Sequence, residues 1–275
     1  MSELFKRVVV AVILIPIAFV IVIVGGIYFF VAIALISTLV LQEFYKMSEQ
    51  KGYSPSIILS LIFNFIVLLR FYFTTQNIDS FVLSSDLLML IFPTLVLLQQ
   101  LFSKNTNIYA NVGTSFAGLL YITIPMVLLI LIRFQMSIPD VNSAYFILMI
   151  FCSIWICDSA AYFVGKKFGK RKLLASVSPK KTVAGAVGGF SASLLFFPIA
   201  SNFVLPTFPV LYACIIGATI GILGQIGDLV ESKFKRDANI KDSGNLIPGH
   251  GGVLDRFDSI IFTIPIVYVL LSVFY

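Results

Sequence analysis

The chain has 275 residues, of which 59% are hydrophobic and only 12% are charged. A soluble domain usually carries about 25% charged residues, so this composition excludes an ordinary soluble protein and predicts one that lies in a membrane. The three cysteines lie in apolar runs without a CxxC pair, which indicates packing residues with no disulfide or metal role.

Apolar segments divide the chain into about nine predicted transmembrane helices. A bilayer core requires about 20 mostly apolar helical residues, and charges, prolines and polar clusters separate the segments. The first run is too long for a cleaved signal peptide, so we expect it to remain as a span. The predicted fold is all-α and polytopic, an integral membrane protein with spans at 8–25, 27–44, 56–73, 83–102, 112–133, 143–164, 184–204, 210–230 and 258–274.

Basic residues predict the orientation of these spans. With a cytoplasmic N-terminus, all of the 19 Lys and Arg residues except Arg70 and Arg133 fall on the cytoplasmic side. Most of these cations lie in the last two cytoplasmic loops, in greater number than orientation requires. We therefore expect residues 1–142 to form an N-terminal transmembrane scaffold and residues 143–275 to form a C-terminal catalytic region.

Carboxylates also concentrate in or beside the apolar segments of the second half. A charge in hydrocarbon costs at least about 2.5 kcal/mol, so such groups normally face a cavity, a partner or an ion. Asp255 and Asp258 share a helix face at i, i+3, and together with Asp228 they offer the oxygen ligands that suit Mg²⁺. For Glu231, helix capping or a position near the membrane surface explains the charge as well as a role in the site does. Asp158 is expected to lie just outside the ligand set.

A stripe of glycines leads along one predicted helix toward Asp228. Gly217, Gly221 and Gly224 share a helix face with Asp228 and Glu231. Two explanations remain open: the glycines let two helices pack closely, or they line a gap through which a lipid headgroup reaches the metal.

The segment "SKFKRDANIKDSGNLIPGHGGVLDRFD" combines cations with flexible glycine backbone. Cations, glycine amides and metal-binding carboxylates together are what a polyphosphate requires. His250 lies among glycines, which favours a hydrogen bond to phosphate or metal-bound water over proton transfer. A second basic patch occurs in "SPKKTVAGAVGG", although no GxxxxGK[ST] motif is present in the sequence. The candidate substrate-binding residues are Lys180, Lys181, Thr182, Lys235, Arg236, Lys241, Asp242, Arg256 and Asp158.

Residues 232–258 read S-x-F-K-R-x4-K-D-x-G-x2-I-P-x-H-G-G-V-x-D-R-F-D, which resembles the signature of phosphatidate cytidylyltransferases, or CDP-diacylglycerol synthases. The stretches "WICDSAAYFVGKKFGK" and "SPKKTVAGAVGG" are also similar to that family. The detailed resemblance covers residues 150–260. One departure is Ala184, where the family commonly has Glu, so any role of that carboxylate is in doubt.

The resemblance implies transfer of CMP from CTP to phosphatidate, giving CDP-diacylglycerol and pyrophosphate for phospholipid biosynthesis. It implies a catalytic set of Asp228, Asp255, Asp258 and His250, with the three aspartates binding Mg²⁺. Whether a second cation joins Mg²⁺ is left open. The expected location is the cell membrane, with the active site facing the cytoplasm. A homodimer is a further implication, and no nucleic-acid partner is expected.

Two other functions remain as alternatives. A CDP-alcohol phosphotransferase also uses membrane aspartates, but its D-x2-D-G-x2-A-R run is absent because Ser259 follows Asp258. An ion-coupled transporter would explain intramembrane carboxylates but gives no reason for the two strongly basic loops.

Overall fold

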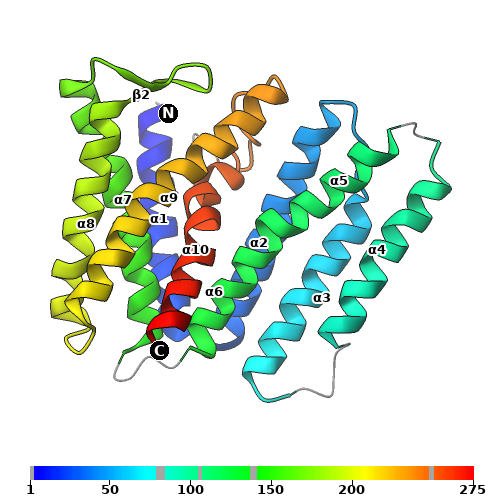
Figure 1. Ribbon diagram of the computed structural model, residues 1–275, viewed down its shortest axis with the longest axis horizontal. Helices are drawn as coiled ribbons and strands as arrows, with labels where there is room; N and C mark the ends of the chain where they lie inside the picture. Colours follow the sequence, from blue (N-terminus) through cyan, green and yellow to red (C-terminus); the bar gives the residue numbers. More distant parts are fainter. Residues whose placement is uncertain (1–2, 79–83, 105–106, 137–140, 248–250) are drawn as a thin grey trace.

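The computed structural model describes residues 3–78, 84–104, 107–136, 141–247 and 251–275, which form a helical bundle (Figure 1). The first part comprises α1 (Glu3–Val24), α2 (Gly26–Glu49), α3 (Ile57–Thr75), α4 (Ser85–Leu101), α5 (Ile108–Gly118), η1 (Leu119–Thr123) and α6 (Ile124–Phe134). The second part comprises α7 (Ser143–Phe168), β1 (Lys172–Leu174), β2 (Ser178–Thr182), α8 (Val183–Val204), α9 (Val210–Asp237) and α10 (Leu254–Phe274).

Seven helical segments in the described part of the chain are long and apolar enough to cross a membrane. They are Gly26–Glu49, Ile57–Thr75, Ile108–Phe134, Ser143–Phe168, Val183–Val204, Val210–Asp237 and Leu254–Phe274. Each coincides with a predicted span. The first and fourth predicted spans correspond to α1 and α4, whose apolar stretches, Val12–Val24 and Asp86–Leu101, are shorter. The polytopic, all-α class is therefore confirmed, and the count of nine remains a prediction.

The span Ile108–Phe134 contains one π-helical turn, η1, between α5 and α6. Pro125 follows directly, and it lacks the amide N–H that would continue the α-helical hydrogen-bond pattern. The turn brings Tyr121 against Phe234 of α9, with ring centroids 5.8 Å apart. The π-helical turn thus contacts α9, the helix that carries Asp228, Lys235 and Arg236 of the predicted site.

Small residues let α7, α8 and α9 pack closely. A Cβ on Gly189 of α8 would lie 2.8 Å from the carbonyl oxygen of Cys157 in α7, and a Cβ on Gly217 of α9 would lie 2.8 Å from that of Ser193 in α8. Gly221 is equally constrained by Phe190. Gly217 and Gly221 therefore let α9 pack closely against α8, as the packing explanation predicts, and the lipid gap stays a prediction.

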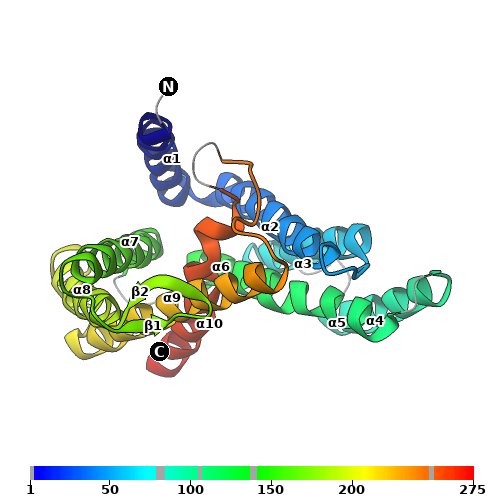
Figure 2. The same ribbon diagram turned by 90° about the horizontal axis from the view of Figure 1, so that it is seen from above.

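The polar loops gather at one end of the bundle. The N-terminus, the β1–β2 hairpin and the C-terminal end of α9 lie at this end, and the C-terminus lies at the other (Figure 1). The strands pair antiparallel, with Lys172 opposite Thr182 and Leu174 opposite Ser178, and the hairpin lies over α9 when viewed from above (Figure 2). The sequence did not predict this hairpin, which is a small addition to the helical fold.

Arg133, one of the two basic residues predicted on the non-cytoplasmic side, has a structural explanation. Its Nε donates to the carbonyl of Val22 at 3.0 Å, and Nη2 donates to that of Ile23 at 3.2 Å. These carbonyls belong to the last turn of α1, where a cation is favoured by the helix dipole. Arg133 therefore anchors α1 to α6, which accounts for a cation that breaks the charge pattern.

Candidate active site

A cavity of about 730 Å³ opens between α7, α8, α9, α10 and the hairpin. Most of the predicted site residues line it, although they come from separate parts of the sequence. These are Asp158, Lys180, Lys181, Thr182, Asp228, Lys235, Asp242, Asp255, Arg256 and Asp258. The helices and hairpin therefore bring the two basic segments and the aspartates to one place, as the sequence predicts.

Two of the predicted residues that the structure describes do not line this cavity. Arg236 does not line it, and its guanidinium donates to the carbonyls of Val177 at 3.4 Å and Ile240 at 3.2 Å. Arg236 thus ties the hairpin turn to the end of α9. Lys241 is exposed and also lies outside the lining, and His250 falls outside the described residues. The substrate-binding or catalytic roles of these three residues stay predictions.

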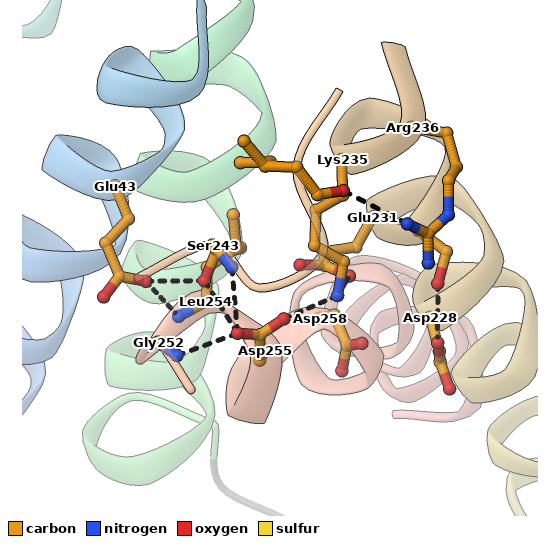
Figure 3. Close-up of polar contacts among 12 residues, drawn as sticks. Glu43, Asp228, Glu231, Lys235, Arg236, Ser243, Gly252, Leu254, Asp255 and Asp258 are labelled. Atoms are coloured by element: carbon orange, nitrogen blue, oxygen red, sulfur yellow. Dashed lines mark hydrogen bonds and ion pairs between the residues drawn. The ribbon is translucent and has the colours of Figure 1, made fainter. Parts of the chain in front are cut away.

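Three carboxylates converge at the floor of the site. Asp228 and Glu231 lie on α9 and Asp258 on α10, and one oxygen from each lies within 4.8 Å of the others (Figure 3). Glu231 is completely buried, and neither oxygen has a hydrogen bond of favourable geometry, although Lys235 Nζ lies 2.6 Å from Oε2. A buried carboxylate without hydrogen bonds is costly unless a cation compensates it. The cluster therefore has the oxygen donors and the negative charge to hold a divalent cation.

Lysine side chains are interleaved with these carboxylates. Lys235 Nζ lies 2.6 Å from Glu231 Oε2 and 2.5 Å from Asp255 Oδ1, and Lys181 Nζ lies 2.5 Å from Asp228 Oδ2. The sequence placed Lys235 in a loop, which is wrong because α9 continues to Asp237. The extra turns bring Lys235 to the i+4 position from Glu231, so the two charges pair within one helix.

Asp255 has different surroundings from Asp258. Its Oδ2 accepts hydrogen bonds from the Gly252 amide at 2.8 Å, the Ser243 amide at 3.0 Å and the Ser243 hydroxyl at 3.1 Å (Figure 3). Asp255 thereby holds the segment between α9 and α10 against Lys235. Both members of the predicted i, i+3 pair line the cavity, but only Asp258 belongs to the carboxylate cluster. A metal-binding role for Asp255 stays a prediction.

The hairpin delivers the second basic patch to the cavity. Thr182 ends β2 and is the N-cap of α8, where its Oγ1 accepts from the Gly185 amide at 3.1 Å. Lys180 and Lys181 precede it and line the cavity. Ala184, which replaces the expected glutamate, is half-buried and does not line the cavity. Strand β2 of the hairpin therefore contributes the cations Lys180 and Lys181 to the site.

One carboxylate beside this site was missed by the sequence reasoning. Glu43 lies on α2, in the predicted scaffold, and only 8% of its surface is exposed. It accepts hydrogen bonds from Ser243 and the Leu254 amide (Figure 3) and from the Val253 amide. A lone acidic residue in an apolar helix is the signal that could have identified it, had carboxylates of the first half been considered.

Comparisons with known proteins identify the family of this chain. The sequence model of the cytidylyltransferase family matches residues 5–274. A phosphatidate cytidylyltransferase of Bacillus subtilis is 36% identical, with 92% of each chain covered. One of Synechocystis sp. is 34% identical over 96% of this chain and 94% of its own length, and one of Staphylococcus saprophyticus is 34% identical over 90% and 91%. The chain therefore belongs to the cytidylyltransferase family.

Proposed function

We propose that this protein transfers CMP from CTP to phosphatidate, giving CDP-diacylglycerol and pyrophosphate for phospholipid biosynthesis. The observation that carries the proposal is the single cavity in which Asp228 and Asp258 face Lys180, Lys181 and Arg256. Family membership and the names of the relatives support the same reaction.

The reaction is a nucleotidyl transfer between two anions. An oxygen of the phosphatidate phosphate attacks the α-phosphorus of CTP, and the bond from this phosphorus to the oxygen shared with the β-phosphate breaks. The attacking phosphate is already ionised near neutral pH, so a strong general base is unnecessary. Catalysis then requires mainly positioning and the neutralisation of charge as pyrophosphate leaves.

The carboxylate cluster fits Mg²⁺. Asp228, Glu231 and Asp258 supply converging oxygens, and the ion pairs with Lys181 and Lys235 compensate only part of their negative charge. When bound, Mg²⁺ would neutralise phosphate charge and polarise the α-phosphate. Asp255 is also a predicted ligand, but its ion pair with Lys235 would have to break before it could bind the metal. A second cation remains part of the proposal.

The cations around the cavity would bind the two substrates. Lys180 and Lys181 come from the hairpin and Arg256 from α10, and all three line the cavity in which phosphates would bind. Lys235 would compensate the buried carboxylates as well as attract phosphate. His250 is proposed to donate a hydrogen bond to phosphate or to metal-bound water.

We also propose a location and an orientation. The protein would span the cell membrane nine times, with α1 and α4 as additional spans and the N-terminus in the cytoplasm. The cavity would then face the cytoplasm, where CTP is found, and residues 143–275 would form the catalytic region on a scaffold of residues 1–142. A homodimer is proposed from the family resemblance.

The test uses the purified full-length protein in detergent or liposomes. With CTP, phosphatidate and Mg²⁺, we expect pyrophosphate release and one CDP-diacylglycerol for each CTP consumed, as measured by mass spectrometry. Ion flux into liposomes without CTP consumption would indicate the transporter. Release of CMP from CDP-diacylglycerol and an alcohol would indicate the phosphotransferase.

A further inference from the structure

Glu43 is a buried carboxylate that extends from α2 to the segment before α10. Its Oε1 accepts from the Val253 amide at 3.0 Å. Its Oε2 accepts from the Leu254 amide at 2.9 Å and the Ser243 hydroxyl at 2.8 Å (Figure 3). Hydrogen bonds to an ionised acceptor are about twice as strong as neutral ones. Both oxygens are therefore satisfied, and all three donors belong to the segment that carries the predicted site.

These contacts supply a helix cap that α10 does not have in its own sequence. Val253 is the N-cap residue of α10, and its apolar side chain makes no capping hydrogen bond. The first amides of a helix have no partner inside the helix, and a negative charge beside them is favoured by the helix dipole. Glu43 fills this role from a position more than 200 residues earlier in the chain.

The same carboxylate is linked to Asp255 through Ser243. The single hydroxyl hydrogen of Ser243 is shared between Glu43 Oε2 at 2.8 Å and Asp255 Oδ2 at 3.1 Å. Asp255 in turn pairs with Lys235, and both line the cavity. A displacement of Glu43 would therefore release one side of the network that fixes Asp255.

Two glycines show how closely the segment is fitted around Glu43. A Cβ on Gly244 would lie 2.5 Å from Glu43 Oε1, and a Cβ on Gly252 would meet Glu43 Oε2 more closely still. Neither glycine has a positive φ, so available space and not backbone conformation explains the absence of a side chain at these positions. The backbone of the segment is thus in contact with the carboxylate on two sides.

We propose that Glu43 is a positioning residue for the nucleotidyl-transfer site: it fixes the N-terminus of α10 and, through Ser243, the carboxylate of Asp255. The inference deepens the proposed function and rests on it. Glu43 does not line the cavity and touches no substrate in this arrangement. Its effect on the reaction comes entirely from holding the groups that do line it.

The first test is Glu43→Gln, which keeps the size of the side chain but replaces one acceptor oxygen with an NH₂ group. We expect kcat to fall about 10- to 100-fold, because displacement of reacting groups by about 1 Å can cost 100-fold. Hydrogen exchange at the Val253 and Leu254 amides should become faster in the same variant. A kcat within twofold of the wild type, or a loss of kcat without faster exchange at these amides, would overturn the proposal.

Tyr45→Phe is the matched control on the same helix. The Tyr45 hydroxyl is buried and donates to the Ser115 carbonyl at 2.8 Å, away from the α10 segment. We expect this variant to lower Tm and to leave kcat within about twofold when both variants are assayed well below their melting temperatures. If the two variants lose kcat equally, Glu43 acts only through overall stability and the proposal fails.

Ser243→Ala decides the question if Glu43→Gln does not fold. It keeps the two amide bonds to Glu43 and removes only the hydroxyl bridge to Asp255. We expect kcat to fall about three- to tenfold with a Tm close to the wild type, and wild-type kcat would refute the bridge. If the wild type itself transfers no CMP, the proposed function fails, whereas the exchange experiment still reports whether Glu43 orders α10.

Discussion

Lys235→Met tests whether the lysine compensates the buried charge of the site. Lys235 Nζ lies 2.6 Å from Glu231 and 2.5 Å from Asp255, with the lysine side chain 12% exposed and the two carboxylates 0% and 7% exposed. Methionine keeps much of the side-chain volume and removes the cation. Glu231 would then be buried with neither a hydrogen bond nor a counter-charge from Lys235.

The distances set the expected size of the effect. At an effective dielectric constant of about 20, charges separated by 2.6 Å attract by roughly 6 kcal/mol. The cost of removing the charged groups from water offsets part of this attraction, and measured losses on breaking a buried pair are about 3–5 kcal/mol. We therefore expect Lys235→Met to lower the free energy of unfolding by about 3–5 kcal/mol.

The assay is denaturant unfolding of the purified protein in detergent with EDTA present, so that metal does not compensate the carboxylates. The double variant Glu231→Gln/Lys235→Met should lose less stability than Lys235→Met alone, because it leaves no uncompensated charge at Glu231 and Asp255 keeps its hydrogen bonds to Gly252 and Ser243. Lys51→Met is the control, since Lys51 forms an exposed ion pair with Asp237 at 3.3 Å and should change stability by less than about 1 kcal/mol. The reasoning is refuted if Lys235→Met is as stable as the Lys51 control, or if Glu231→Gln restores nothing.

Three further predictions concern the metal, the helix packing and the topology. Asp228→Asn and Asp258→Asn should each lower turnover about 100-fold or more and abolish the rise in Tm that Mg²⁺ gives the wild type; a variant that keeps half its activity is not a ligand variant. Gly217→Val should lower the free energy of unfolding, measured by thermal unfolding, by about 1–3 kcal/mol, because its Cβ would lie 2.8 Å from a carbonyl oxygen of α8. In the control Gly113→Ala, the new Cβ would have nothing within 4 Å, so this variant should be as stable as the wild type or slightly more stable. In a cysteine-free background, single cysteines can be labelled with a thiol reagent that does not cross the membrane. A cysteine in the hairpin turn should react only from the cytoplasmic side, and a cysteine that replaces Pro206 should react only from the opposite side. Labelling of both cysteines from the same side would contradict the proposed orientation.

Scarcity of charge made much of the site predictable from the sequence. In an apolar chain, Asp228, Asp255 and Asp258 stand out because a membrane protein seldom places carboxylates in its spans without a purpose. The same reasoning identified Lys180 and Lys181, since orientation alone does not require so many cations. All five residues line the one cavity.

What the sequence could not show depends on contacts between distant segments. Glu231 was as easily explained by a position near the surface, and only packing of α9 against α10 reveals that it is fully buried beside Asp258. Glu43 was missed because only the carboxylates of the second half were considered, and its partners lie 200 to 211 residues away. Lys235 was placed in a loop because the predicted span ended where charged residues begin, although the helix continues to Asp237.

The cap that α2 provides for α10 has a consequence for biosynthesis. Ribosomes release helices into the membrane in chain order, so α2 is inserted long before Val253 and Leu254 emerge. Until these residues and Ser243 have been synthesised, the Glu43 carboxylate lacks its three hydrogen-bond donors. Partly synthesised chains would therefore contain a scaffold but no assembled site, and activity would begin only when the earliest and latest parts of the chain meet. Expression of residues 1–142 and 143–275 as separate chains in one cell should restore activity only if the two fragments associate.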